Sequence, residues 1–370
     1  MAKILILANN DVGLYKFRKE LLIELVEENE VYISLPYGDY IPQLEELGCI
    51  FINTSISRRG TNPVTDLKLL MKYRQIIKNV KPDVVLTYTI KPNVYGGVAC
   101  RLAKIPYIAN VTGLGTAVEK EGILQKITLN LYKSALKKAS CVFMQNKENE
   151  DFFKEKRIIR DNSRLIPGSG VNLEEYSLLK YPSDKEINFL FIARVMKEKG
   201  IDQYLEAAKY IKKKYSQTVF HVLGFCEQEY TNKLERMEEL GIIKYHGMQK
   251  NVRKFHAISH CTIHPSYYPE GMSNVLLEAA ASGRPIITTD RNGCREIVDN
   301  KVSGYIIEQK STEDLIKKIE EFLKLSIDMK MKMGIEGRKK VEKEFNRSII
   351  IHAYIEEINE VLISKQAKKE

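Results

Sequence analysis

The stretch Lys3-Ile-Leu-Ile-Leu-Ala8 decides how the first half of the chain folds. It is a short apolar run, and residues 14–28 follow it with apolar side chains at helical spacing. A continuous apolar run is typical of a strand buried on both faces of a parallel sheet, with the helix as its crossover. Similar strand and helix patterns alternate as far as residue 144. The sequence therefore predicts an open, doubly wound parallel sheet with helices on both faces.

The alternation is interrupted once and then resumes. Turn-forming residues fill Ile166-Pro-Gly-Ser-Gly-Val171 and the irregular stretch up to residue 182, and a new apolar strand follows at Asn188-Phe-Leu-Phe-Ile-Ala193. We therefore expect two α/β domains, residues 1–165 and residues 166–345, and a helical segment at residues 346–370. Ligands of open α/β sheets bind at the carboxyl ends of the strands, so we expect a cleft between two facing domains.

Composition and charge exclude several classes of protein. The 370 residues are 44% hydrophobic and 29% charged, which argues against disorder and fibrous repeats. We find no apolar run long enough to cross a bilayer and no signal peptide, so we expect a cytoplasmic protein. Six widely spaced cysteines suggest buried free thiols, not disulfides or a metal site. The net charge of +10, of which +7 precedes residue 166, favours an anionic partner.

Two cations follow the strand at residues 188–193. Arg194 comes directly after it, and Lys199 comes five residues later, just before a predicted helix. A guanidinium beside an ammonium at a helix N-terminus suits a diphosphate. A solvated basic turn would show the same spacing, so the next motif decides between the two interpretations.

That motif runs from His264 to Gly283 and contains two glutamates. Pro269 and Gly271 prevent a helix from starting before about residue 272, so Glu270 stays in the loop at the helix mouth. Glu278 falls inside the helix, among apolar residues, where a charge needs partners. The two carboxylates are too far apart to share a proton. They suit a ligand held at both ends, with a sugar at one carboxylate, a ribose at the other and the intervening amides on phosphate. A nucleotide sugar has this shape.

Together these residues resemble a known family. Arg194 and Lys199, the Glu270-x7-Glu278 pair, Ser282-Gly-Arg-Pro-Ile and Gly293-x-x-Glu296-Ile-Val are similar to motifs of family-4 retaining glycosyltransferases of the GT-B fold. The resemblance implies two Rossmann-like domains, of which the second binds the nucleotide sugar without a metal or cofactor. It implies that the catalytic residues are Arg194, Lys199 and Glu270, and that the donor-binding residues are Gly271, Met272, Ser273, Asn274, Val275 and Glu278.

The first domain carries candidate acceptor residues after its own strands. A helix that opens with cations after the first strand favours a phosphate-bearing acceptor, although a surface basic patch would look the same. Segments 87–97 and 110–115 follow later strands. They resemble a subgroup that builds capsule, O-antigen or N-linked glycans on polyprenyl diphosphate. The predicted acceptor-binding residues are Gly13, Tyr15, Lys16, Arg18, Lys91, Asn110 and Thr112.

Two further features bear on the first domain. Many family-4 enzymes place a histidine there, near the reacting carbon, but this chain has none before His221. Asn110 or Thr112 are alternatives for that role. A helix at about residues 121–138 mixes leucines with lysines, as interfacial helices do, and a core-facing helix would show the same pattern. We expect peripheral contact with the anionic inner face of the cell membrane.

The predicted reaction is transfer of a hexose or N-acetylhexosamine from a UDP-sugar to a saccharide on polyprenyl diphosphate, with retention at the anomeric carbon. Two alternatives stay open: a nucleotide-sugar 2-epimerase, which needs no acceptor, and a donor-binding partner subunit without activity. We expect no nucleic-acid binding, because the basic residues are spread out and lack an aromatic-basic sheet signature. The resemblance also implies that the C-terminal helix returns to the first domain.

Overall fold

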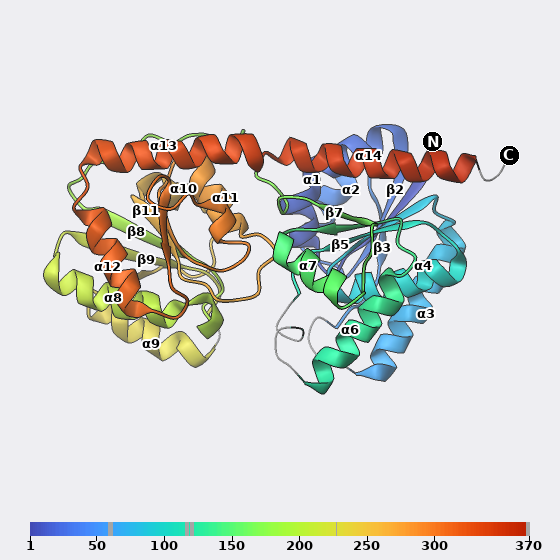
Figure 1. The fold of residues 1–370 in the computed structure, drawn as a ribbon, viewed down its shortest axis with the longest axis horizontal. Coiled ribbons are helices and arrows are strands. Elements are labelled where there is room, and N and C mark those ends of the chain that lie inside the picture. Colours follow the sequence, from blue (N-terminus) through green and yellow to red (C-terminus); the bar gives the residue numbers. More distant parts are fainter. Residues whose placement is uncertain (58–61, 115–117, 119–121, 227, 368–370) are drawn as a thin grey trace. The chain divides into compact units, whose positions relative to one another are not determined.

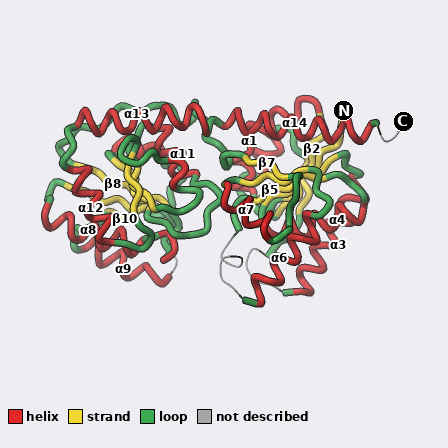
Figure 2. The backbone as a smooth tube through the Cα atoms, viewed as in Figure 1, coloured by secondary structure: helices red, strands yellow, loops and turns green. Residues whose placement is uncertain are grey.

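The computed structural model describes residues 1–57, 62–114, 118, 122–226 and 228–367. The chain forms two compact units, one made of Met1–Ser169 with Ser348–Glu370 and the other of Gly170–Arg347. Each unit has a central parallel sheet, drawn in yellow in Figure 2, with helices packed against it. The prediction of two parallel-sheet α/β domains is confirmed.

The sheet of the first unit has the strand order β3-β2-β1-β4-β5-β6-β7. Its strands are β1 (Ala2–Leu7), β2 (Asn29–Leu35), β3 (Ile50–Asn53), β4 (Val84–Tyr88), β5 (Tyr107–Val111), β6 (Cys141–Met144) and β7 (Ser163–Leu165). Its helices are α1 (Asp11–Glu28), α2 (Ile41–Glu46), α3 (Pro63–Val80), the π-helical turn η1 (Pro92–Gly96), α4 (Gly97–Ala103), α6 (Ile123–Leu136) and α7 (Lys147–Glu155). The short strands β3 and β7 were not predicted from the sequence.

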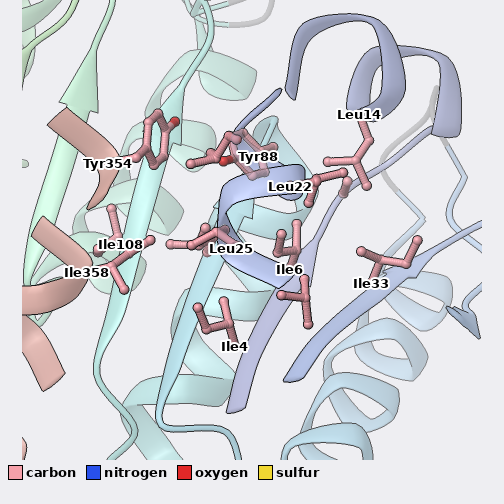
Figure 3. Packing of buried hydrophobic residues seen from close by; sticks show 14 of the residues in the cluster. Ile4, Ile6, Leu14, Leu22, Leu25, Ile33, Tyr88, Ile108, Tyr354 and Ile358 are labelled. Atoms are coloured by element: carbon pink, nitrogen blue, oxygen red, sulfur yellow. The ribbon is translucent and has the colours of Figure 1, made fainter. Parts of the chain in front are cut away.

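Alternate residues of β1 face opposite sides of the sheet, and each side has its own apolar cluster. Ile4 and Ile6 pack with α1 and α2, whereas Leu5 and Leu7 pack with α3, α4, α6 and α7. The C-terminal helix α14 (Arg347–Gln366) joins the first of these clusters. Figure 3 shows its Tyr354 and Ile358 among the buried side chains of the first unit. The last helix of the chain therefore completes the core of the first unit.

The sheet of the second unit has the order β10-β9-β8-β11-β12-β13. Its strands are β8 (Ile187–Ile192), β9 (Thr218–Leu223), β10 (Lys244–Tyr245), β11 (Cys261–His264), β12 (Ile286–Thr289) and β13 (Gly304–Ile307). Its helices are η2 (Lys197–Lys199), α8 (Ile201–Lys214), α9 (Gln228–Glu239), α10 (Arg253–Ile258), α11 (Asn274–Ala281), η3 (Arg295–Ile297), α12 (Thr312–Leu323) and α13 (Ile327–Glu344), as labelled in part in Figure 1.

Both sheets have one place where the strand order reverses. In the first unit it lies between β1 and β4, and in the second between β8 and β11. The loops that leave neighbouring strands at such a point diverge to opposite faces and leave a crevice at the carboxyl edge of the sheet, where ligands of this architecture bind. The fold therefore defines one candidate ligand position in each unit.

Two whole-chain features bear on the sequence predictions. Among the described residues, no helix combines the length and apolarity needed to cross a bilayer. The six cysteines are free thiols, and all except the half-buried Cys226 are buried.

Candidate functional site

The candidate site of the second unit lies where its strand order reverses. Strand β8 leads to Arg194 and then to η2, which ends at Lys199. Strand β11 pairs directly with β8, and the loop that follows it runs from Pro265 to Ser273, before α11. The two loops that carry the predicted catalytic residues therefore leave adjacent strands at the same edge of the sheet.

A glycine lets these two loops touch. Gly200 ends η2 with a φ of 76°, and a Cβ atom at this position would lie 2.1 Å from the carbonyl oxygen of Pro265. Only glycine tolerates both the left-handed backbone and this close approach. The contact continues as Tyr267 donates its backbone N–H to the carbonyl of Glu198 at 2.9 Å. The turn that carries Lys199 is thus fixed against the loop after β11.

The side chains of the two loops form one charged cluster around an aromatic ring. The Lys199 ammonium forms an ion pair and hydrogen bond with the Glu270 carboxylate. The ring of Tyr268 has the Lys199 Nζ 4.8 Å from its centroid and the Arg194 Cζ 5.7 Å from it. Both separations are within the range of cation–π attraction. The structure therefore brings Arg194, Lys199 and Glu270 together.

His264 completes the cluster on its buried side. It is the last residue of β11, and its Nε2 lies 3.9 Å from Glu270 Oε1 and 3.5 Å from the hydroxyl of Ser273. Burial lowers the pKa of His264 below its ordinary value, so the ring is neutral at physiological pH. Burial alone would raise the pKa of Glu270, but the Lys199 charge and the nearby His264 ring outweigh it and lower that pKa to about 2. Glu270 is therefore an anion that neutralises part of the lysine charge.

The Gly293-x-x-Glu296 segment supports the Glu270 loop from behind. Gly293 has a φ of 79°, and a Cβ atom there would lie 2.6 Å from the carbonyl oxygen of Gly271. Its carbonyl accepts the backbone N–H of Ser273 at 2.7 Å, and its own N–H donates to the Glu296 carboxylate at 2.8 Å. The chain forms the 3-10 turn η3 at this point. This turn acts as a support for the loop.

Helix α11 begins beside the cluster, as the motif predicts. Ser273 is its N-cap residue, but its side chain makes no capping hydrogen bond and its hydroxyl lies toward His264. The predicted donor-binding residues Gly271, Met272 and Ser273 are buried, while Asn274 and Val275 are half-buried. The first turn of this eight-residue helix therefore adds its positive dipole end to the two cations.

Glu278 occupies a different position from the other three predicted charges. It is half-buried on α11, and together with burial it raises the pKa of Tyr176 above its ordinary value. The two groups therefore interact, and Tyr176 is a partner for the charge in this apolar stretch. Glu278 lies one turn into α11, whereas Glu270 precedes the helix.

The candidate acceptor residues of the first unit surround its own reversal point. Gly13 lies in the first turn of α1 and donates its N–H to the Asn10 side chain at 2.6 Å. Tyr15 stacks on Tyr40 with ring centroids 5.0 Å apart, and Lys16 is exposed. These residues follow β1, as predicted.

Arg18 differs from the expectation that it faces a ligand. Its side chain is only 5% exposed, and its guanidinium carbon lies 5.2 Å from the ring centroid of Tyr88 and 5.7 Å from that of Tyr354. One nitrogen donates to the carbonyl of Phe17 at 2.7 Å. The helical spacing that placed Arg18 beside Leu14 and Leu21 turns it inward, so it supports the site from within the unit.

The remaining acceptor candidates follow β4 and end β5. Lys91 forms an ion pair with Asp66 at 2.7 Å. Asn110 is buried, and its side-chain nitrogen donates to the Tyr354 hydroxyl. Thr112 is half-buried directly after β5. The predicted acceptor segment 110–115 includes Gly115, which lies outside the described residues.

Two residues of the second-unit cluster were missed as functional candidates. Tyr268 lies between the two cations, and His264 lies against Glu270. Both stand within the quoted motif, and the position of His264 at the end of a strand beside the reversal point was an available signal. Among the described residues, no group of His, Cys, Asp or Glu side chains is arranged to hold a metal ion.

The fold and this site define a class of protein: two doubly wound α/β units, the second with a cation cluster suited to a diphosphate. Comparison with known proteins agrees. Residues 3–146 match the family model described as glycosyl transferase 4-like, and residues 180–340 match glycosyl transferases group 1. The chain therefore belongs to the glycosyltransferases of the GT-B fold.

Relatives and solved structures give further detail. The chain is 27% identical to the N,N'-diacetylbacillosaminyl-diphospho-undecaprenol alpha-1,3-N-acetylgalactosaminyltransferase of Campylobacter jejuni, over 96% of this chain and 98% of that protein. It is 26% identical to the UDP-Gal:alpha-D-GlcNAc-diphosphoundecaprenol alpha-1,3-galactosyltransferase of Escherichia coli, over 76% of each. The crystal structure of Anabaena HepE with UDP-glucose has a TM-score of 0.81 at 18% identity, covering 97% of this chain and all of that one.

Proposed function

We propose that this glycosyltransferase moves a hexose or N-acetylhexosamine from a UDP-sugar to a saccharide carried on polyprenyl diphosphate, in the assembly of capsule, O-antigen or N-linked glycans. The observation that carries the proposal is the cluster of Arg194, Lys199 and Glu270 around Tyr268, at the reversal point of the second sheet. The names of the two relatives supply the acceptor class, because both act on sugars linked to undecaprenyl diphosphate.

The electrostatics of the cluster suit the departure of a diphosphate. When the bond from the anomeric carbon to the diphosphate breaks, negative charge builds on the leaving oxygen. Arg194, Lys199 and the first turn of α11 stabilise that charge from positions set before the reaction. The ammonium of Lys199 has three donors, so it can contact phosphate while it keeps Glu270. Glu270, as an anion, accepts hydrogen bonds from hydroxyls of the transferred sugar.

We further propose that transfer proceeds with retention and without a metal. The acceptor hydroxyl oxygen bonds to the anomeric carbon on the face that the diphosphate leaves, and its proton passes to the departing diphosphate. In this scheme Arg194 and Lys199 supply the positive charge at the diphosphate. Glu278, near Tyr176, would hold the ribose of the donor.

The acceptor side of the proposal concerns the first unit. Gly13, Tyr15 and Lys16 after β1, with Lys91 after β4 and Thr112 after β5, would line the acceptor position, and Asn110, buried within β5, would support them. Arg18 would act as a positioning residue beneath them, because it is buried between Tyr88 and Tyr354. We propose that the enzyme works at the cytoplasmic face of the membrane, in peripheral contact with anionic lipid.

A transfer assay with product analysis tests the function. The purified protein is incubated with a panel of UDP-sugars and a GlcNAc-diphosphopolyprenol of short chain length, with and without EDTA, and the product linkage is read by NMR. We expect one UDP-sugar to give an α-linked disaccharide at an unchanged rate in EDTA. An epimerised free nucleotide sugar, or donor binding without product until a second protein is added, would contradict the proposal. A β-linked product would contradict retention, and loss of activity in EDTA would contradict metal independence.

A further inference from the structure

One layer of helices in the first unit has an unusual outer surface. Helices α3, α4 and α6 lie together against one side of the first sheet (Figure 1), and their buried residues share one apolar cluster. Both α3 and α6 pack against η1 and α4. Because these helices cover the same face of the sheet, their exposed residues belong to one outer layer, which we call the α3–α4–α6 face.

The α3–α4–α6 face exposes large apolar side chains. Ile123 is 79% exposed and Val64 is 63% exposed, so most of the surface of each residue is in contact with water. Exposed apolar residues are common singly, but a group of them on one surface indicates an interaction site. The exposed large apolar residues of this face are Val64, Leu67, Met71, Leu102, Ile123, Leu124, Ile127 and Leu131.

Among the described residues of these three helices, the exposed charges are of one sign. The three helices contain one acidic residue, Asp66, which is buried and paired with Lys91 and the Tyr95 hydroxyl. The cations exposed on the helices and directly after them are Lys68, Lys72, Arg74, Lys78, Lys81, Lys104, Lys126, Lys133, Lys137 and Lys138. The outer helices of the second unit differ, because α8, α9 and α12 each mix acidic and basic residues. The basic surplus of the first half of the chain is therefore concentrated on one surface.

A groove within the face combines both properties. It has a volume of about 570 Å³ and lies between α3 and the end of α4. Met71 and Leu102 supply exposed apolar walls, and Arg74, Lys78 and Lys81 supply cations. A phospholipid needs this combination, because its acyl chain is apolar and its phosphate is anionic.

The most exposed apolar residues lie at the edge of the sheet where ligands bind. Crossover helices run antiparallel to their strands, so the first turns of α3 and α6 lie at the carboxyl edge of the sheet. Asp66, in the first turn of α3, confirms this placement through its ion pair with Lys91, which follows β4. Val64, Leu67, Ile123 and Leu124 belong to these first turns, beside the proposed acceptor position.

We propose that the α3–α4–α6 face binds the surface of an anionic lipid bilayer. Its apolar side chains would enter the headgroup region and its cations would contact lipid phosphates. The inference rests on the proposed function. If the acceptor is linked to a polyprenyl lipid, a bilayer at this face would bring it to the carboxyl edge of the first sheet. It refines the expected membrane contact from one helix to a defined three-helix surface.

Vesicle flotation of the full chain tests this assignment. We expect binding to vesicles of phosphatidylglycerol and phosphatidylcholine at low salt, weaker binding in high salt, and little binding to phosphatidylcholine alone. The double variant Lys68→Glu/Lys72→Glu should bind about 25-fold more weakly, since each lysine lost near an anionic surface weakens binding about fivefold. Leu67→Ser/Ile127→Ser should weaken binding about tenfold or more for each side chain. All four positions are exposed, so we expect the variants to fold.

Matched changes on the second unit provide the control. Lys209→Glu/Lys213→Glu has the same spacing on α8, and Leu240→Ser/Met329→Ser alters equally exposed apolar residues. These variants should bind vesicles as the unaltered protein does. The inference is overturned if the unaltered protein fails to bind anionic vesicles at low salt, or if face and control variants weaken binding equally. It is also overturned if the face variants only dissociate a protein dimer and leave vesicle binding intact.

The same variants separate this inference from the proposed function. Transfer to a short-chain, water-soluble acceptor and thermal stabilisation by UDP-sugars should be unchanged in the face variants, because no residue of the charged cluster is altered. If the unaltered protein binds vesicles but transfers no sugar, the proposed function fails and the surface assignment stands. If it transfers sugar but does not bind vesicles, the surface assignment fails and the proposed function stands.

Discussion

The reversal points of the two sheets have the same topology and opposite chemistry. In the second unit, the loops after β8 and β11 place Arg194 at the surface and hold Lys199 against Glu270 beside the Tyr268 ring. In the first unit, Arg18 after β1 is buried between Tyr88 and Tyr354. At the edge of the second sheet Arg194 is exposed and accessible to a ligand. At the edge of the first sheet Arg18 is buried in the core.

This difference shows that topology fixes where a ligand position lies, while individual side chains decide what it can bind. In the second unit Lys199, Glu270 and Arg194 are assembled around Tyr268, and we propose that they bind a diphosphate. The first unit depends on Tyr354 of α14, the last helix of the chain, to enclose Arg18 and Asn110. A change of pH and single substitutions in each unit test this contrast.

Acid should destabilise the second unit far more than the first. Five histidines lie in the second unit, and burial lowers the pKa of His221 and His260 to about 4 and of His256 to about 3. Because the unfolded chain binds protons at these residues near pH 6.5 and the folded unit does not, stability falls as pH drops below 6.5. At pH 5 each of the three histidines lowers the free energy of unfolding of the second unit by about 2 kcal/mol, or by about 6 kcal/mol together.

Hydrogen exchange measured by mass spectrometry at pH 7 and pH 5 follows each unit separately, after correction for the intrinsic exchange rate. We expect β8, β9 and β11 to lose protection at pH 5, while β1, β4 and β5 keep theirs. The only histidine of the first unit, His352, is exposed. Equal loss in both units would show that the buried histidines do not cause the asymmetry.

The variant Tyr354→Ala should destabilise the first unit by about 3–5 kcal/mol, the usual cost of truncating a buried aromatic residue. The ring is 1% exposed, lies 4.4 Å from the Phe143 centroid and encloses the Arg18 guanidinium. Thermal unfolding measures the loss. Tyr210→Ala, at a half-exposed tyrosine of α8, is the control and should change stability little. A loss below about 1 kcal/mol would show that α14 does not support the buried arginine.

The variant Gly293→Ala should shift the Glu270 loop and destabilise the second unit by about 2 kcal/mol. The added methyl group would lie 2.6 Å from the Gly271 carbonyl oxygen. Gly241→Ala is a matched control, since Gly241 also has a positive φ, 66°, but its added methyl group meets nothing within 4 Å. Thermal unfolding and UDP-sugar titration measure both effects. If the two variants behave alike, backbone strain alone explains the result and the supporting contact does not matter.

The variant Glu270→Gln should reduce discrimination between donor sugars by about tenfold, which corresponds to about 1.4 kcal/mol and to one charged hydrogen bond. It keeps the shape of the side chain while removing the charge that we propose binds sugar hydroxyls. Competition between two UDP-sugars in one assay gives the ratio of kcat/KM values. Glu239→Gln, on the exposed end of α9, is the control. Unchanged donor selectivity would argue against contact between Glu270 and the sugar.

The sequence predicted much of the fold, because apolar runs and helical spacing report burial directly. The site was predicted in part. Lys199 and Glu270 follow strands, and strands of this pattern place such residues at one sheet edge. Tyr268 was missed because an aromatic residue in a loop has no periodic signal. The inward position of Arg18 was missed although its spacing from Leu14 and Leu21 indicated it, because the ring that encloses the charge, Tyr354, lies 336 residues away in the chain. Contacts of this range leave no local pattern.

We propose that Lys199 stabilises the departing diphosphate. Steady-state kinetics of the variant Lys199→Ala measure this role. We expect kcat to fall by about a thousandfold with a much smaller change in KM for the UDP-sugar, because the lysine acts on charge that develops during the reaction. Lys197→Ala changes an exposed lysine of the same turn and should keep near-normal rates. Equal turnover in Lys199→Ala and Lys197→Ala would contradict the account.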